Sequence, residues 1–150
     1  MIKIILLICG FVGVILSGQR KLGTRLANDI ILTVQKAHLG NLPNGQYAEQ
    51  YVSAKHLSRE ELCAPLDKDT LQQVEACSNV DKHQVSCRVV RENIGFKGGT
   101  VSFAITICFE GELPNGQHVK IDIQDKLLIA TLLLEKHTWY LTQIDTIKVP

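Results

Sequence analysis

Apolar and polar side chains alternate strictly over residues 100–110, and this is the clearest pattern in the chain. The apolar set is Val101, Phe103, Ile105, Ile107 and Phe109, and the intervening set is Ser102, Ala104, Thr106, Cys108 and Glu110. Successive side chains of a β-strand point to opposite faces of the sheet. The pattern therefore predicts a strand with one buried and one solvated face.

Three other segments of the C-terminal half have strand character, namely residues 83–90, 118–135 and 138–149. Within residues 118–135 the run "VKIDI" gives way to "LLIATLLLE" at Asp125, where we expect a β-bulge. The expected turns are marked by Gly95, Gly98 and Gly99, by Asn115-Gly116 with positive φ angles, and by Glu135-Lys136-His137. This half is therefore predicted to be a four-stranded antiparallel meander.

The N-terminal half has helical periodicity. Leu26, Ile30, Val34 and Ala37 recur on one face of a helix, Leu22 continues that face upstream, and Gly40 is expected to end the helix. A second helix is predicted within residues 46–57, because Tyr47, Tyr51 and Ala54 would share one face.

Two shorter helices are predicted by their capping residues. "SREE" at Ser58 to Glu61 has the capping-box pattern, and Pro65 should stop the helix that it starts. Asp67 or Asp69 then caps a further helix, which carries Leu71, Val74 and Cys77 at three-residue spacing.

The pentapeptide "LPNGQ" occurs twice, at residues 42–46 and 113–117. The first copy lies between two predicted helices and the second between two predicted strands. Nothing around the two copies matches, so we interpret the repeat as shared turn chemistry rather than as a duplication.

Helices followed by strands predict a single α+β domain over residues 22–149, with the helical half packed on one face of a curved sheet. Residues 1–18 are set apart by composition, because the apolar run from Ile4 to Leu16 covers 13 residues. That length fits a signal peptide better than a membrane span of about 20 residues.

The cleavage site is weak, because Leu16 or Ile15 stands at the −3 position, where a small residue is preferred. An uncleaved membrane anchor through residues 2–18 therefore remains an alternative. A lipid attached at Cys9 and a buried N-terminal core helix are two further readings.

Four cysteines lie outside the leader: Cys63, Cys77, Cys87 and Cys108. An even set in an exported domain predicts two disulfides, and we favour Cys63–Cys77 with Cys87–Cys108 because near neighbours in sequence meet most easily. Side-chain parity opposes the second pair, because Cys87 lies on the more apolar face of its strand and Cys108 on the polar face of the next. The other two pairings and four reduced, buried thiols remain open.

The composition argues against several activities. The net charge is +1 with 16 basic and 15 acidic side chains, which gives no basic excess for nucleic acid. The cysteine spacings include no C-x-x-C, so we expect no metal, and nothing predicts a cofactor.

Catalytic chemistry is equally unsupported by local motifs. The five histidines, His38, His56, His83, His118 and His137, stand alone with no nucleophile motif nearby. Asp122 should lie on a solvated face, and Trp139 should lie in the core with Tyr140 on the opposite face. We therefore expect no catalytic residues.

The order of elements resembles the NTF2-like (cystatin-like α+β) superfamily. The resemblance rests on a leading amphipathic helix, "GQYAEQYVSAKHLSREEL", and a meander ending in "LLLEKHTWYLTQIDTI", where Glu135, Lys136, Trp139, Leu141 and Ile144 fit a last hairpin common among small exported members. It implies the fold and carries over no catalytic residue. A pilin-like arrangement is less similar, because Ile15 stands where such leaders carry Glu.

The sequence thus predicts a non-enzymatic domain, exported or tethered outside the cytoplasmic membrane, that binds a protein partner. Such a domain would be an envelope or secretion-apparatus component, or an immunity-type inhibitor. The alternative is a protein that binds a small apolar ligand between sheet and helices. An isomerase- or hydratase-type enzyme in the same cavity is a third reading.

Overall fold

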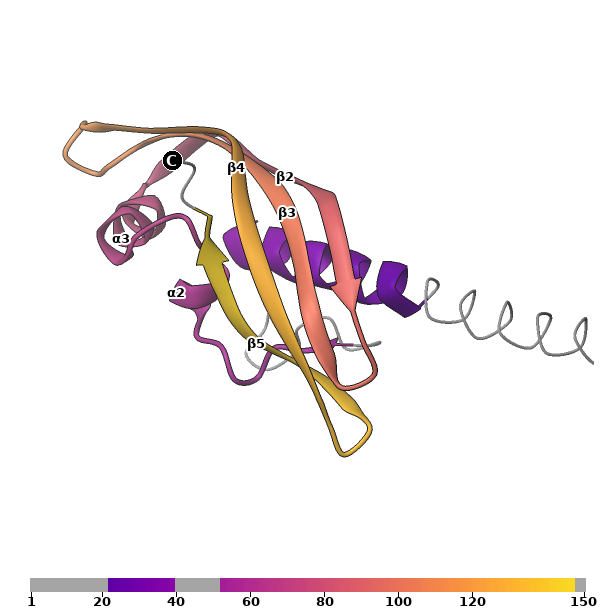
Figure 1. Cartoon of the computed structure of the whole chain (residues 1–150). Helices are drawn as coiled ribbons and strands as arrows, with labels where there is room; N and C mark the ends of the chain where they lie inside the picture. Colours follow the sequence, from indigo (N-terminus) through magenta and orange to yellow (C-terminus); the bar gives the residue numbers. More distant parts are fainter. Residues whose placement is uncertain (1–21, 40–51, 148–150) are drawn as a thin grey trace, which may run out of the picture.

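The computed structural model describes residues 22–39 and 52–147. Its elements after the first helix (residues 22–39) are β1 (Val52–Ser53), α2 (Arg59–Leu62), α3 (Lys68–Ala76), β2 (Asn79–Ile94), β3 (Gly98–Glu112), β4 (His118–Glu135) and β5 (Thr138–Thr146). The strands form one strongly curled sheet in the order β1-β5-β4-β3-β2 (Figure 1). The α+β class predicted from the sequence is confirmed.

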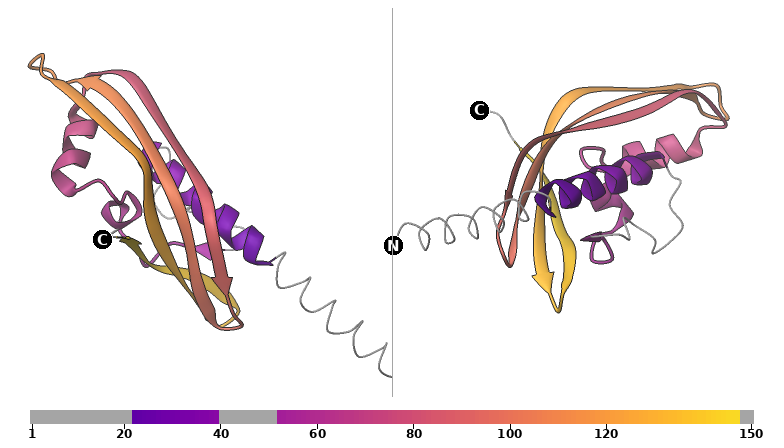
Figure 2. Two further views of the ribbon diagram at one scale, coloured as in Figure 1. Left: turned by 45° about the horizontal axis from the view of Figure 1, so that its top comes forward. Right: turned by 90° about the vertical axis from the view of Figure 1, so that its right-hand side faces the viewer.

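The helix over residues 22–39 lies against the concave face of the sheet (Figure 2). Leu26, Ile30, Val34 and Ala37 are buried, as their spacing predicts. Leu22 is 36% exposed, so the prediction that it continues the buried face is wrong. Gly23 lies beside Ile94 at the end of β2, so Leu22 extends beyond the sheet that would cover it. Gly40 lies outside the described residues.

The predicted helix over residues 46–57 is wrong in its described part. Val52 and Ser53 form β1, which pairs in parallel with Trp139 and Tyr140 of β5. Pairing with a distant strand overrides the local helical pattern here, and it buries Val52 in the core. The sheet is therefore mixed and five-stranded, in place of the predicted four antiparallel strands. Tyr47, Tyr51 and the first "LPNGQ" lie outside the described residues.

Both predicted capping arrangements are confirmed. The Ser58 hydroxyl accepts from the Glu61 N–H while the Glu61 carboxylate accepts from the Ser58 N–H, and α2 ends at Leu62, before Pro65. Asp67, rather than Asp69, caps α3 by accepting from the Thr70 N–H at 2.7 Å. Leu71 is buried and Cys77 is the C-cap of α3.

The antiparallel meander contains the predicted bulge. Ile105 pairs with Lys126 and Ile107 with Ile123, so β4 has one residue more than β3 at this point. Asp125 has a φ of 46°, and its N–H donates to Thr106 Oγ1 at 3.1 Å. A bulge increases the local twist of a sheet. β4 bends along its length in the curled sheet (Figure 1).

The turns follow the predicted positions, with one difference. Lys136 and His137 have φ values of 48° and 68°, which suits a two-residue hairpin between β4 and β5. Between β3 and β4, Gly116 has a φ of 87° but Asn115 has no positive φ. The prediction of positive φ at both residues is wrong. The Leu113 N–H donates to the Gln117 carbonyl, which closes a longer loop with one glycine in the left-handed region.

The core lies between the concave face of the sheet and the first helix. Its largest members include Phe103, Ile105, Ile107, Leu128 and Leu132 of the strands. Trp139 is 8% exposed and belongs to this core, as predicted. Tyr140 contacts the ring of His56 instead, with 4.8 Å between ring centroids.

Among the described residues, none of the helices combines the length and the apolar character that crossing a membrane requires. The predicted leader at residues 1–18 lies outside the described residues.

Candidate functional site

β4 is twice as long as β5, its neighbour on one side, and half of the β4 edge on that side is therefore open. β4 spans 18 residues, whereas β5 spans 9 and pairs only with residues Leu128 to Glu135. The last contact on that side is a hydrogen bond from the Ile147 N–H to the Leu127 carbonyl. Within the described part of the chain, no strand therefore pairs with residues 118–126 on the side away from β3. We call residues 118–126 the free edge of β4.

The direction of the backbone groups along this edge follows from the hairpin. Residues opposite each other in an antiparallel pair alternate between bonding to each other and bonding outward. The Leu113 N–H donates to the Gln117 carbonyl, so Leu113 and Gln117 bond to each other. The backbone N–H and C=O groups of the next pair, Glu112 and His118, therefore point away from each other. The Glu112 carbonyl accordingly accepts from the Ser78 N–H. The same alternation makes the backbone groups of His118, Lys120 and Asp122 point away from β3.

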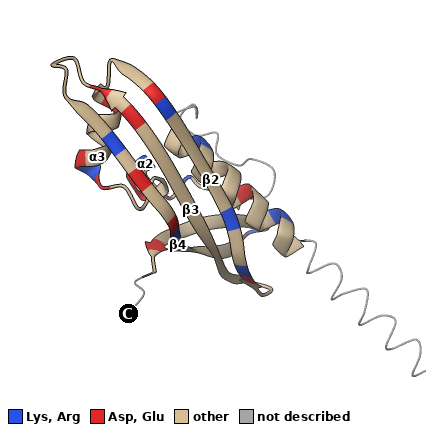
Figure 3. Ribbon diagram, turned by 90° about the horizontal axis from the view of Figure 1, so that it is seen from above, with Lys and Arg blue, Asp and Glu red and all other residues tan. Residues whose placement is uncertain are grey.

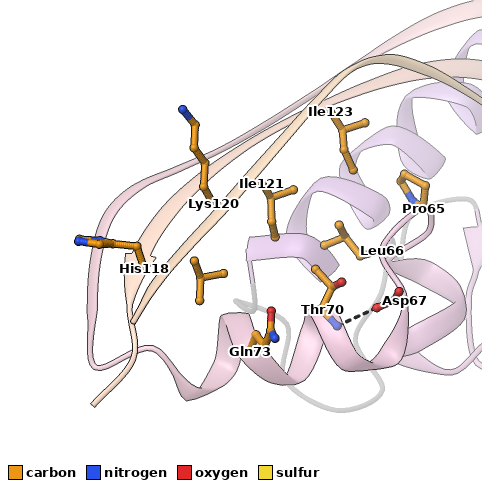
Figure 4. A pocket seen from close by; sticks show the side chains of 10 residues that line it. Pro65, Leu66, Asp67, Thr70, Gln73, His118, Lys120, Ile121 and Ile123 are labelled. Atoms are coloured by element: carbon orange, nitrogen blue, oxygen red, sulfur yellow. Dashed lines mark hydrogen bonds between the residues drawn. The ribbon is translucent and has the colours of Figure 1, made fainter. Parts of the chain in front are cut away.

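A groove of about 410 Å³, open to solvent on one side, lies between the free edge and α3. Ile121 and Ile123 point from β4 towards α3, and Leu66, Thr70 and Gln73 point towards them (Figure 4). The groove is also lined by Pro65, Asp67, His118, Val119 and Lys120. Alternation along β4 gives the groove its apolar wall, because every second residue faces α3.

Charged and polar groups surround this apolar wall. Lys120 lies 3.8 Å from Glu110, and Asp122 accepts from the Gln124 amide at 2.7 Å. Hydrogen bonds from Thr70 hold the pKa of Asp67 below its ordinary value, so Asp67 is ionised at neutral pH. Asp122 and Asp125 are exposed, as predicted for Asp122.

The outer face of the sheet carries both signs of charge over its strands (Figure 3). Arg88 of β2 lies 3.9 Å from Asp125 at the bulge, across β3. Both side chains are more than two-thirds exposed, so this pair contributes little to stability.

Of the five histidines, His38 and His83 are neighbours, because the His83 ring hydrogen-bonds the backbone of His38. His38 is 4% exposed, and its Nε2 lies 3.1 Å from the Ala64 carbonyl oxygen. His83 packs edge-on against Phe109, while His118 lines the groove and the ring of His56 contacts that of Tyr140 at a tilt of 50°. Among the described residues, no three His, Cys, Asp or Glu side chains are placed to hold a metal ion.

The predicted Cys87–Cys108 pair is wrong, because the strand register separates the two residues. Cys87 lies opposite Ile105, whereas Cys108 lies opposite Gln84 and Asp122. Cys87 packs against the core on the concave side, and Cys108 lies on the outer face, as side-chain parity indicated.

Cys63 and Cys77 are free thiols as well. Cys63 is fully buried, and desolvation raises its pKa to about 11. The Cys77 thiol donates to the Gln73 carbonyl at 3.3 Å, at the end of α3. Desolvation raises the pKa of Cys87 to about 12, so neither Cys63 nor Cys87 has the character of a reactive cysteine.

The free edge and its groove were not predicted from the sequence. One signal was available, because the strand pattern over residues 118–135 is about twice as long as the apolar part of the last strand. No protein-family model, curated protein or solved structure matches this chain. The resemblance to the NTF2-like superfamily therefore stays a prediction.

Proposed function

We propose that this chain is a non-enzymatic, exported or membrane-tethered domain that binds an extended segment of a protein partner. The segment would pair as an additional strand with the free edge of β4, and one of its faces would lie over the groove beside α3. The observation that carries the proposal is the combination of outward backbone groups at His118, Lys120 and Asp122 with an apolar groove directly beside them. Strand addition uses these two features, since backbone bonds give affinity and alternate side chains give specificity.

The chemistry of the segment follows from the groove. Every second side chain of the added strand would point towards α3 and meet Val119, Ile121 and Ile123, so we expect Val, Ile, Leu or Phe at these positions. The intervening side chains would lie on the outer face beside Lys120 and Asp122. An acidic residue opposite Lys120 is favoured there, because opposite charges across a strand pair stabilise it by about 0.2 to 1 kcal/mol.

A binding selection from a library of displayed ten-residue peptides tests this proposal. We expect the selected peptides to share apolar residues at alternate positions, with an acidic residue between two of them. Addition of such a peptide should shift the backbone NMR signals of residues 118–124 and 67–73. Shifts confined to another surface, or a selection that yields no peptide, would contradict the proposal.

Two variants of Lys120 separate backbone from side-chain recognition. Lys120→Pro removes an N–H that points outward, so it should abolish binding while leaving the β3 ladder intact. Lys120→Glu keeps the N–H and should shift the selected peptides from acidic to basic residues at the facing position. A Lys120→Pro protein that is folded by circular dichroism and still binds would refute strand addition.

A small apolar ligand is the second candidate, because the groove has the volume of a ligand site and an apolar wall. The groove is open on one side, which favours a chain over an enclosed ligand. Lys120→Pro distinguishes the two, since ligand binding would survive the loss of one outward N–H.

Export is tested separately. Residues 1–30 fused to a reporter that is active only outside the cytoplasm should give an active reporter. An inactive reporter, with the protein in the soluble cytosol, would refute export without bearing on the groove.

A further inference from the structure

Exposed apolar side chains gather at the end of the sheet where the described chain begins. Phe96, in the turn between β2 and β3, is 76% exposed, Leu133 is 40% exposed and Leu22 is 36% exposed. Exposed apolar residues are ordinary when scattered singly, but a group of them marks an interaction surface. We call Leu22, Phe96, Lys97, Leu133 and Lys136 the hairpin-end surface.

Contacts between the elements bring these residues to one end of the molecule. Gly23 lies next to Glu92 and Ile94, so the start of the first helix is beside the end of β2. The Leu134 N–H donates to the Lys97 carbonyl at 2.8 Å, which holds the β2–β3 turn against β4. Leu133 pairs with Gly98, and the β4–β5 turn follows it directly. Both hairpins and the start of the helix lie at this end in Figure 1.

The sequence before residue 22 places this end close to the apolar leader. Only residues 17–21 separate Leu16, the last residue of the apolar run, from Leu22. Six Cα–Cα steps join Leu16 to Leu22, and they span at most about 21 Å in any conformation. If the leader enters a bilayer, the start of the helix is therefore held within that distance of the apolar layer.

The sequence that leads into this end is basic. Arg20 and Lys21 precede the helix in the sequence, whereas Lys97 and Lys136 in the two turns are balanced by Glu92 and Glu135. Basic residues beside an exposed aromatic ring are typical of segments that lie in the headgroup region of a membrane.

We infer that the hairpin-end surface contacts the surface of an anionic lipid bilayer beside the point where residues 4–16 enter it, with Phe96 inserted among the headgroups. This inference rests on the membrane tether of the proposed function and is independent of the groove. The contact would fix the orientation of the domain, because a second point of attachment removes its rotation about the tether.

Fluorescence quenching in the full chain tests the contact. The protein is reconstituted into vesicles of phosphatidylcholine and phosphatidylglycerol, with and without a brominated phosphatidylcholine that quenches tryptophan. The chain has one tryptophan, Trp139, which is buried in the core, so the brominated lipid should not quench its emission. In Phe96→Trp we expect bromination to lower the added emission by roughly twofold.

Val80→Trp is the matched control, because Val80 is 47% exposed near the opposite end of β2. Its emission should not change on bromination. Lys97→Glu with Lys136→Glu should weaken the quenching of Trp at position 96, as should replacing phosphatidylglycerol with phosphatidylcholine.

Two failures are distinguishable. A protein that does not float with the vesicles overturns both the tether and the contact. A protein that floats, but whose Phe96→Trp emission is unchanged or falls no more than that of Val80→Trp, overturns the contact and leaves the tether standing.

Discussion

His38 Nε2 lies 3.1 Å from the Ala64 carbonyl oxygen, and this hydrogen bond joins the first helix to the segment between α2 and α3. With Nε2 as the donor, Nδ1 is unprotonated, and among the described residues it has no hydrogen-bond partner. Desolvation, partly offset by the bond to Ala64, lowers the pKa of His38 to about 4. The imidazole is therefore neutral in the folded protein at physiological pH.

Stability should consequently fall on mild acidification. The unfolded chain takes up a proton at His38 near pH 6.5, whereas the folded chain does so near pH 4. Between these two pH values the unfolded chain carries a proton on His38 that the folded chain does not. The free energy of unfolding is therefore at its full value above about pH 6.5 and decreases as the pH falls towards 4. The loss amounts to about 3 kcal/mol. Urea denaturation at several pH values measures it.

His38→Leu should flatten this pH dependence, because it removes the titrating group. The pKa of His83 is also lowered by burial, although His83 is only part-buried, so His83→Gln should have a smaller effect in the same direction. An unchanged slope between pH 4 and 6.5 in His38→Leu would show that other groups cause the acid sensitivity.

The cysteines should differ in reactivity towards iodoacetamide. Cys63 and Cys87 have pKa values raised to about 11 and about 12 by burial, so their thiolate fraction at neutral pH is very small. We expect both to be alkylated only after unfolding, and Cys108 to react in the native protein. Mass spectrometry over a time course gives the order of modification. A peptide linked through Cys87 and Cys108 under non-reducing conditions would contradict the register.

Two glycines of the β2–β3 hairpin should respond differently to alanine. A Cβ on Gly99 would collide with the Asn93 carbonyl oxygen and lie 2.6 Å from Ile94 Cα, and these are backbone atoms that cannot turn aside. We expect Gly99→Ala to cost about 2 kcal/mol or more of unfolding free energy. In Gly95→Ala the nearest atom is 3.6 Å away, so this variant should be close to wild type. Equal midpoints for the two variants in urea would count against the described turn.

Phe103 and Phe96 provide a second matched pair. Phe103 is fully buried in the core, and Phe103→Ala should cost about 3 to 5 kcal/mol. Phe96 is 76% exposed, and Phe96→Ala should change stability by no more than about 0.5 kcal/mol. Thermal unfolding measures both. A large loss in Phe96→Ala would mean that this ring supports the fold rather than an external contact.

Local patterns in the sequence were sufficient for several features. The alternation over residues 100–110, the capping box at Ser58, a cap of α3 at Asp67 or Asp69 and the bulge at Asp125 were all predicted, because each depends on residues that are neighbours in the chain. Parity along one strand also indicated that Cys87 and Cys108 face opposite sides of the sheet. These features require no knowledge of which distant segments meet.

The tertiary structure alone decided the rest. Val52 forms a parallel strand because Trp139 of β5 lies beside it, although the local pattern favoured a helix. The burial of His38 depends on the segment around Ala64, which lies 26 residues later in the chain. The free edge of β4 exists because β5 ends its pairing at Leu128, and α3 completes the groove from an earlier part of the sequence. Each of these features depends on strand register and on packing between segments that are far apart in sequence, and local periodicity specifies neither.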